Sequence, residues 1–79
     1  MKVFGYKEKV INDHGLLQMS EVTFQASAKT LRAIAKFLIE SADYMEKHDD
    51  FDHSHIQDDW SEWQDEYPDI IITKYDTTI

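Results

Sequence analysis

Apolar and polar residues alternate in two stretches near the start of the chain, a pattern typical of strands. Four apolar residues lie among the lysines of 2–10, which predicts a first strand. Turn-forming residues occupy 11–15 and end in glycine, and apolar residues return over 16–25. We therefore expect a β-hairpin.

The alternation in the second predicted strand slips by one residue. Leu17 and Met19 share one parity, whereas Val22 and Phe24 share the other. A bulge near 20–21 would bring all four side chains to one face. Without that bulge, the hairpin would carry apolar groups on both faces.

After Ser27 the apolar residues recur with a helical period, and the Ser27 hydroxyl suits a helix N-cap. This pattern predicts a helix over 28–47. Oppositely charged residues four apart on its polar side are worth only a few tenths of a kcal/mol per pair, so an apolar stripe must supply the docking energy. The predicted stripe is Leu31, Ile34, Ala35, Leu38, Ala42 and Met45, widened by Phe37 and Ile39.

Residues 48–67 support two interpretations. A capping box at Ser54 and Gln57 would start a short amphipathic helix. Alternatively, the alternation around His53 and His55 indicates a third strand. We favour a strand at 52–57 and a helical turn around 60–66. The apolar residues that recur at spacings of four, three and four are Ile56, Trp60, Trp63 and Tyr67.

A β-branched run after Pro68 predicts a last strand over 70–75. Ile70 and Ile72 can pack on the helix, which leaves Ile71 and Tyr75 on the other face as a possible interface between copies. The expected fold is a single domain over 1–79 of the two-layer α+β class, in the order β-β-α-(β)-β. Its three- or four-stranded, mostly antiparallel sheet would pack on one long helix.

Composition adds expectations about location. The chain lacks cysteine, its N-terminus lacks the apolar core of a secretory signal, and no run approaches the length of a membrane span. We therefore expect a soluble cytoplasmic protein that does not bind membranes.

Charge is distributed very unevenly along the chain. Of the net charge of −8, residues 1–47 contribute almost nothing, with seven cations and six anions, whereas 48–79 hold ten carboxylates and only Lys74. The resulting self-repulsion has no purpose in a purely structural domain, so it predicts a cationic partner. It argues against direct binding of nucleic acid, because phosphate contacts require clustered lysine and arginine.

Aromatic residues lie within the acidic stretch. In a domain this small, two tryptophans are more often core residues than exposed anchors, but their acidic neighbours stay outside in either case. Carboxylates would steer a basic protein toward the surface, and an aromatic anchor would slow its release. The candidate partner-binding residues are Asp58, Asp59, Trp60, Glu62, Trp63, Asp65, Glu66 and Tyr67.

His53, His55 and Asp58 are the candidate ligands for a metal ion. The signal is weak, because no thiolate and no third spaced histidine supports it, and polar strand residues bonded to nearby acids are the simpler interpretation. No serine lies in a nucleophile motif, and nothing separates the carboxylates into acid and base. We therefore expect no enzyme and no cofactor, with a small metal-binding or metal-dependent module and a homo-oligomeric structural module as alternatives.

Several strings resemble small immunity proteins of bacterial polymorphic toxin systems. They are MSEVTF at 19–24, Leu31 with AKFL at 35–38, DHSHIQD at 52–58 and PDIII at 68–72, so the resemblance spans about 19–72. It implies a small α+β cytoplasmic protein that protects a cell by binding a cognate toxin, and it assigns no binding residues. With the charge pattern, it leads us to expect that residues 49–67 occlude a basic toxin surface, such as the channel of a nuclease.

Overall fold

The computed structural model describes residues 1–11 and 17–74, and side chains for 1–6 and 17–74. Its element order confirms the predicted α+β class. The four strands form two separate antiparallel sheets, β1–β2 and β3–β4, instead of one continuous sheet. The elements are β1 (Lys2–Ile11), β2 (Leu17–Gln25), α1 (Ala28–Lys47), β3 (His53–His55), α2 (Ile56–Asp59) and β4 (Ile71–Thr73).

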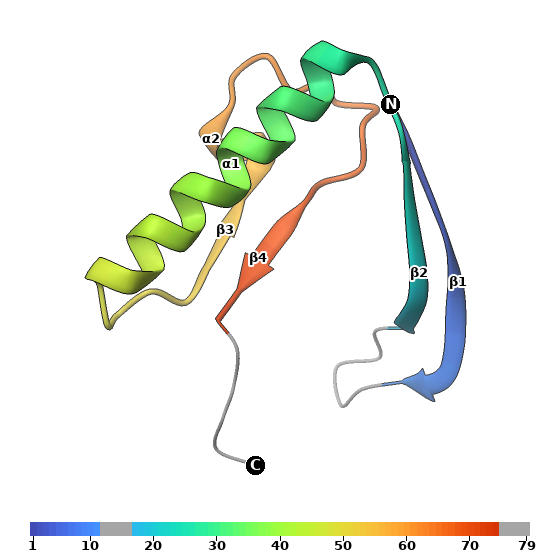
Figure 1. Cartoon of the computed structure of the whole chain (residues 1–79), viewed down its shortest axis with the longest axis horizontal. Coiled ribbons are helices and arrows are strands. Elements are labelled where there is room, and N and C mark those ends of the chain that lie inside the picture. Colours follow the sequence, from blue (N-terminus) through green and yellow to red (C-terminus); the bar gives the residue numbers. More distant parts are fainter. Residues whose placement is uncertain (12–16, 75–79) are drawn as a thin grey trace.

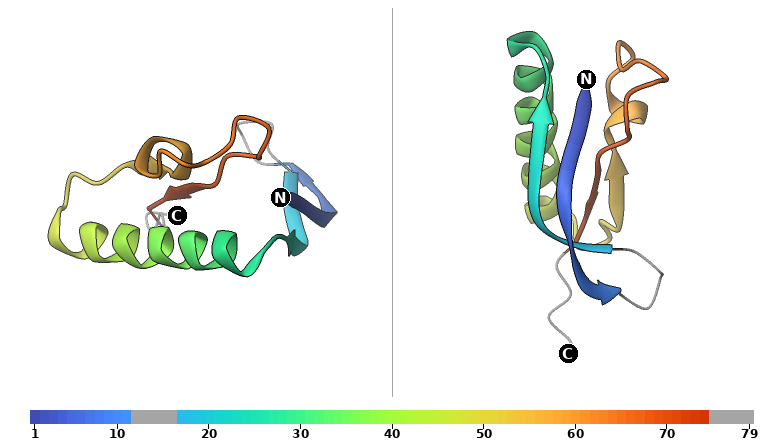
Figure 2. Two further views of the ribbon diagram at one scale, coloured as in Figure 1. Left: turned by 90° about the horizontal axis from the view of Figure 1, so that it is seen from above. Right: turned by 90° about the vertical axis from the view of Figure 1, so that its right-hand side faces the viewer.

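The elements form two layers with a separate hairpin at one end. Helix α1 lies along one side, and α2 with the β3–β4 ribbon lies along the other (Figures 1 and 2). The β1–β2 hairpin adjoins these layers near the start of α1 and otherwise stands apart from them (Figure 1). Met1, just before the hairpin, packs against the core.

Helix α1 has the predicted bounds and the predicted cap. The Thr30 N–H donates to the Ser27 hydroxyl oxygen at 3.2 Å, which satisfies one of the amides left free at a helix start. The helix faces the core differently from the prediction, however. Its buried residues are Thr30, Ile34, Phe37 and Ser41, whereas Leu31, Ala35, Leu38 and Ala42 of the predicted stripe are exposed.

The rotation of α1 has a physical cause. The Ser41 and Ser54 hydroxyls share a 3.0 Å hydrogen bond across the layers, so a polar residue can face inward without an unsatisfied group. The hairpin does not cover the Leu31–Leu38 side of the helix, so those side chains remain in solvent.

The core is small and centred on Ile56, which has no exposed surface. Around it lie Ile34, Phe37 and Trp63, and five partly buried side chains pack against this cluster. Those five are Met1, Trp60, Tyr67, Ile70 and Ile72. The predicted alternation of the last strand is confirmed, since Ile70 and Ile72 face the core and Ile71 is exposed; Tyr75 lies outside the described residues.

Local structure between α1 and β4 differs from the prediction. The strand at 53–55 is shorter than expected, and the helical turn comes earlier, at 56–59. The alternative interpretation, a capping box at Ser54 and Gln57, is wrong, because His55 is the N-cap of α2 and makes no side-chain cap bond, while the Ser54 hydroxyl is bonded to Ser41. The Ser54 hydroxyl thus bonds to α1 across the layers instead of capping the neighbouring helix α2.

The predicted bulge in the hairpin is confirmed. Tyr6 pairs with Glu21 and the next residue, Lys7, pairs with Met19, so Ser20 is the extra residue, and its hydroxyl donates to the Tyr6 carbonyl at 3.2 Å. The register brings the four apolar residues of β2 to one face. Gly5 lies opposite Val22, where a β-carbon would collide with the Met19 side chain and a backbone carbonyl.

The Ile56 side chain provides a direct test of this core. We expect Ile56→Ala to lower the free energy of unfolding by about 2–5 kcal/mol and Ile56→Val by about 0.5–1.5 kcal/mol, because each leaves a cavity. Urea titration followed by tryptophan fluorescence measures both. The exposed neighbour provides the control: Ile71→Ala should change the value by no more than about 0.5 kcal/mol, and equal losses for Ile56→Ala and Ile71→Ala would contradict the assignment of the core.

Candidate functional site

Successive backbone turns, not one continuous helix, place the aromatic residues of 56–67. The N–H of Trp60 donates to the Ile56 carbonyl at 2.9 Å, that of Trp63 to the Trp60 carbonyl at 3.0 Å, and that of Tyr67 to the Gln64 carbonyl at 3.0 Å. Each turn brings the next apolar side chain back to the core. The residues between them therefore face solvent.

Trp63 occupies the middle of an aromatic row. Its ring centroid lies 5.7 Å from that of Trp60 and 5.2 Å from that of Tyr67, with the Tyr67 ring edge-on. Trp63 is buried, with 7% of its surface exposed, whereas Trp60 and Tyr67 are half-buried. Within the described part of the chain the Trp63 indole N–H has no hydrogen-bond partner. Within this row, Trp60 and Tyr67 are thus the side chains that a partner can reach.

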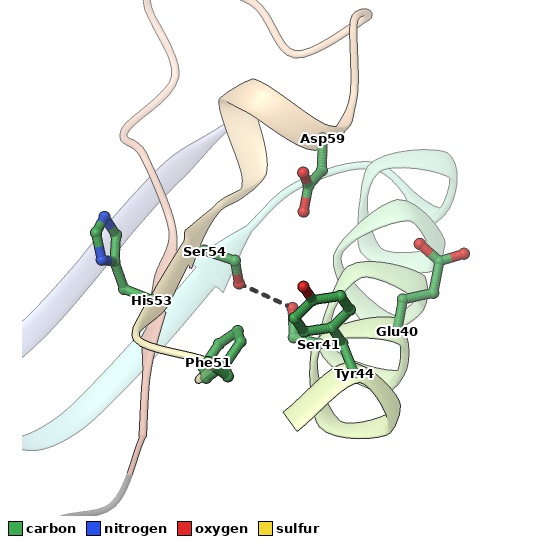
Figure 3. A pocket seen from close by; sticks show the side chains of 7 residues that line it. All are labelled: Glu40, Ser41, Tyr44, Phe51, His53, Ser54 and Asp59. Atoms are coloured by element: carbon green, nitrogen blue, oxygen red, sulfur yellow. Dashed lines mark hydrogen bonds between the residues drawn. The ribbon is translucent and has the colours of Figure 1, made fainter. Parts of the chain in front are cut away.

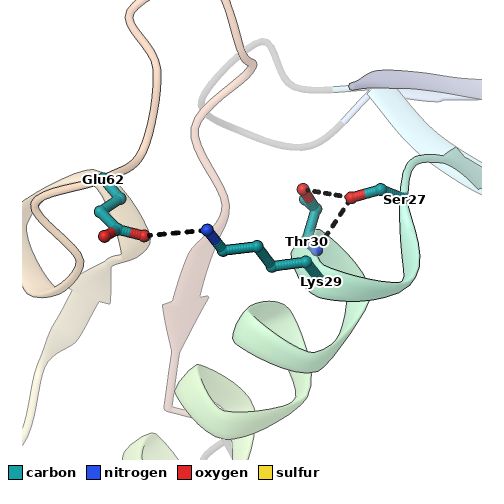
Figure 4. Close-up of polar contacts among 4 residues, drawn as sticks. All are labelled: Ser27, Lys29, Thr30 and Glu62. Carbon is teal, nitrogen blue, oxygen red and sulfur yellow. Dashed lines mark hydrogen bonds and ion pairs between the residues drawn. The ribbon is translucent and has the colours of Figure 1, made fainter.

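The five carboxylates of 58–66 all belong to exposed residues. Over 1–11 and 17–74, the only lysine or arginine that reaches them is Lys29, whose ammonium lies 3.7 Å from the Glu62 carboxylate (Figure 4). Both side chains of that pair are largely exposed, at 80% and 63%, and such pairs are worth at most about 1 kcal/mol. The negative charge is therefore not neutralised within the described structure.

Three adjoining hollows form a groove along α1 on the side of α2. The first, of about 510 Å³, has Tyr44 and Phe51 in its wall and lies beside the Ser41–Ser54 bond (Figure 3). It shares Glu40 and Asp59 with a second hollow of about 110 Å³. Trp60 joins the second to a third, of about 310 Å³, which reaches Glu62 and Tyr67. We call this the α1–α2 groove.

Carboxylates, aromatic rings and two lysines line the α1–α2 groove together. Lys36 lies 3.9 Å from the Glu40 carboxylate, and Lys29 borders the third hollow. Glu40 on α1 and Asp59 on α2 point into the first hollow from its two sides, with the Tyr44 ring nearby (Figure 3). A groove with this lining suits a lysine or arginine side chain, because carboxylates can bind its charge while an aromatic face contacts its stem. Glu40, Tyr44 and Phe51 are absent from the predicted site, since no local spacing links residues of α1 with those of α2.

The segment before β4 is tied to α2 through a histidine and an aspartate. His55 Nδ1 is hydrogen-bonded to one Asp69 carboxylate oxygen, and the other oxygen accepts from the Gln57 N–H at 3.3 Å. The hydrogen bond to Asp69 raises the pKa of the His55 imidazole, and the charges of Asp69 and Asp58 add to the rise, while partial burial opposes it. This contact fixes α2, and with it Asp58 and Asp59.

The two candidate histidine ligands lie near each other, and each is bonded to a carboxylate. The rings of His53 and His55 have centroids 5.0 Å apart, yet His53 Nδ1 lies 2.6 Å from its neighbour Asp52 and His55 is held by Asp69. Over the described residues no three His, Cys, Asp or Glu side chains are placed to hold a metal ion together. In the same part of the chain no helix is long and apolar enough to cross a membrane.

A family model described as Immunity protein 32 matches residues 21–75, which include all of α1, β3, α2 and β4. The chain belongs to the Immunity protein 32 family. No curated protein and no solved structure matches it significantly.

Membership in the Immunity protein 32 family confirms the resemblance to immunity proteins found in the sequence. It supports a toxin-neutralising role through binding of a cognate toxin, and proteins of this kind are generally inhibitors without enzymatic activity. The match contains the whole α1–α2 groove and all eight candidate partner-binding residues.

The contact between His55 and Asp69 predicts a pH dependence of stability. Because the pKa of His55 is raised in the folded protein, the pair stabilises the fold fully below the unfolded histidine pKa of about 6.5 and loses this contribution as pH rises through the higher folded value. Urea midpoints of the wild type should therefore fall between about pH 5.5 and 8. Asp69→Asn should flatten this fall and His53→Gln should keep it; an unchanged slope in Asp69→Asn would refute the assignment.

Proposed function

We propose that this protein neutralises its toxin by covering a basic surface with the α1–α2 groove and the acidic residues beside it. The observation that carries the proposal is the set of exposed carboxylates over 58–66, of which Glu62 alone forms an ion pair with a lysine within the described structure. A nuclease is the toxin class that fits best, because an enzyme that binds nucleic acid exposes lysine and arginine to phosphates.

Inhibition proceeds by occlusion and requires no chemistry from the immunity protein. Carboxylates of the groove take the places of substrate phosphates on the toxin. Their long-range field raises the association rate, and this effect weakens as salt screens the charges. Trp60 and Tyr67, the accessible aromatic residues, enter the toxin surface and slow dissociation. The buried Trp63 ring packs against the rings of both Trp60 and Tyr67.

Neutralisation of four carboxylates tests the electrostatic part of the proposal. We expect the association rate with the cognate toxin domain to fall roughly tenfold or more at low salt and to become nearly independent of salt. Stopped-flow kinetics over a series of salt concentrations measures both effects. The substitutions are Asp58→Asn, Asp59→Asn, Glu62→Gln and Asp65→Asn.

A matched variant controls for net charge alone. It removes four carboxylates at the far end of α1 and beyond, all on exposed residues. It should retain most of the association rate and of its salt dependence, and equal losses in the two variants would show that net charge, not this surface, governs binding. The control substitutions are Asp43→Asn, Glu46→Gln, Asp49→Asn and Asp50→Asn.

Replacement of Trp60 tests the proposed anchor. We expect Trp60→Ala to weaken toxin binding by about 30-fold or more, mostly through faster dissociation, because aromatic anchors dominate interface energies. Surface plasmon resonance separates the two rates, and circular dichroism verifies the fold. Tyr6→Ala removes an exposed aromatic residue of the hairpin and should leave both rates unchanged. An unchanged dissociation rate in folded Trp60→Ala would exclude Trp60 as the anchor.

A further inference from the structure

The hairpin presents an apolar face that nothing in the described structure covers. The register places Val3, Met19, Val22 and Phe24 on this face, together with Leu17, and their exposed fractions range from 37% to 50%. Only the start of the hairpin, near Met1, reaches the core. A two-stranded hairpin is marginally stable by itself, so this face requires a covering layer.

Helix α1 carries a second uncovered apolar surface. Leu31 and Leu38 are each 43% exposed, and Ala35 and Ala42 lie between and beyond them on the same stripe. Glu40 of the α1–α2 groove is two residues from Leu38, or about 200° around the helix. The stripe and the groove therefore lie on different sides of α1.

The molecule exposes more surface than a compact monomer of its size. Its accessible area is 6728 Å², whereas about 5,000 Å² is expected for a 9.3 kDa protein. Its radius of gyration is 13.9 Å, against about 11.6 Å for a compact domain of this length. The uncovered hairpin face and the α1 stripe both contribute to this exposed area.

Charge indicates which partner can cover these surfaces. The described apolar side chains of both surfaces lie in the near-neutral part of the chain, residues 1–47, whereas the carboxylates are concentrated in 48–79. Two copies of a chain with net charge −8 can meet there without bringing their acidic segments together. Among the described apolar side chains of both surfaces, a strongly basic protein would find no charge to bind.

We propose that a second copy of this chain covers both surfaces, with the hairpin of each copy packed on the α1 stripe of the other. Such a two-fold arrangement uses the same two patches twice. It differs from an interface through Ile71, because it uses neither β3 nor β4. The two α1–α2 grooves remain accessible in the dimer, so this inference does not rest on toxin binding.

Solution mass and two exposed-residue variants test the dimer. Sedimentation equilibrium of the wild type, without toxin, should give twice the chain mass of 9.3 kDa from low micromolar concentration upward. Phe24→Asp and Leu38→Asp should each raise the dimer dissociation constant by about 30-fold or more. Thr23→Asp places the same charge on the opposite face of β2 and should leave the mass unchanged. A one-chain mass at all concentrations, or dimers that persist in both variants, would overturn the proposal.

Cross-linking distinguishes a second copy from closure of the hairpin onto its own helix. The chain has no cysteine, so Val22→Cys and Leu38→Cys each introduce a sole thiol. Oxidation of the mixed single variants should yield a two-chain product with the 22–38 disulfide, identified by peptide mass spectrometry. A Thr23→Cys and Leu38→Cys mixture should yield little. If the double variant Val22→Cys/Leu38→Cys instead gives a one-chain disulfide and the mixture gives none, the hairpin closes on its own helix and the proposal fails.

The toxin itself is the remaining candidate for covering the hairpin. In that case the wild type alone would have a one-chain mass, and Phe24→Asp would weaken toxin binding, which overturns the proposal. Failure of the proposed function would give a different result. The four-carboxylate variant would then bind toxin normally, and the wild type would still have the two-chain mass.

Discussion

Burial of Ile56 against α1 is the contact on which the rest of this fold depends. Ile56 packs with Ile34 and Phe37, and its backbone N–H donates to the Ile70 carbonyl at 2.9 Å, so one residue joins the helix, α2 and the segment before β4. Helix α2 is a single turn and has no stability of its own. The positions of Asp58 and Asp59 therefore depend on how firmly Ile56 is held.

The same packing separates aromatic from acidic residues. Once Ile56 and Trp63 face the core, the backbone turns that connect them must direct the intervening side chains outward, and those are the carboxylates. The mutual repulsion of these carboxylates lowers the free energy of unfolding. Few side chains are fully buried, so the small core must offset that repulsion. A sequence selected for stability alone would replace some of these acids, so their presence agrees with selection for binding.

Local signals in the sequence predicted much of the fold. Ser27 and the apolar period gave the bounds of α1, the parity slip gave the bulge at Ser20, and the isoleucine run gave the two faces around β4. Tertiary contacts decided the rest. The rotation of α1 turns Ser41 inward, where Ser54 satisfies its hydroxyl, and Glu40 became part of the candidate site only because α2 docks beside it. Residue spacing predicts neither the inward-facing Ser41 nor the place of Glu40 in the groove.

Helix α1 combines two surfaces that must not interfere with each other. One side carries Glu40 and Tyr44 in the groove, and another carries Leu31 and Leu38, with the buried residues occupying a third sector. A helix of 20 residues has enough turns for all three, because each sector needs only one residue per turn. If the apolar sector is covered by a second copy, the acidic grooves of the two copies are held in one particle. Each toxin would then meet the field of both chains, which strengthens long-range attraction without any change in the contacts of a single groove.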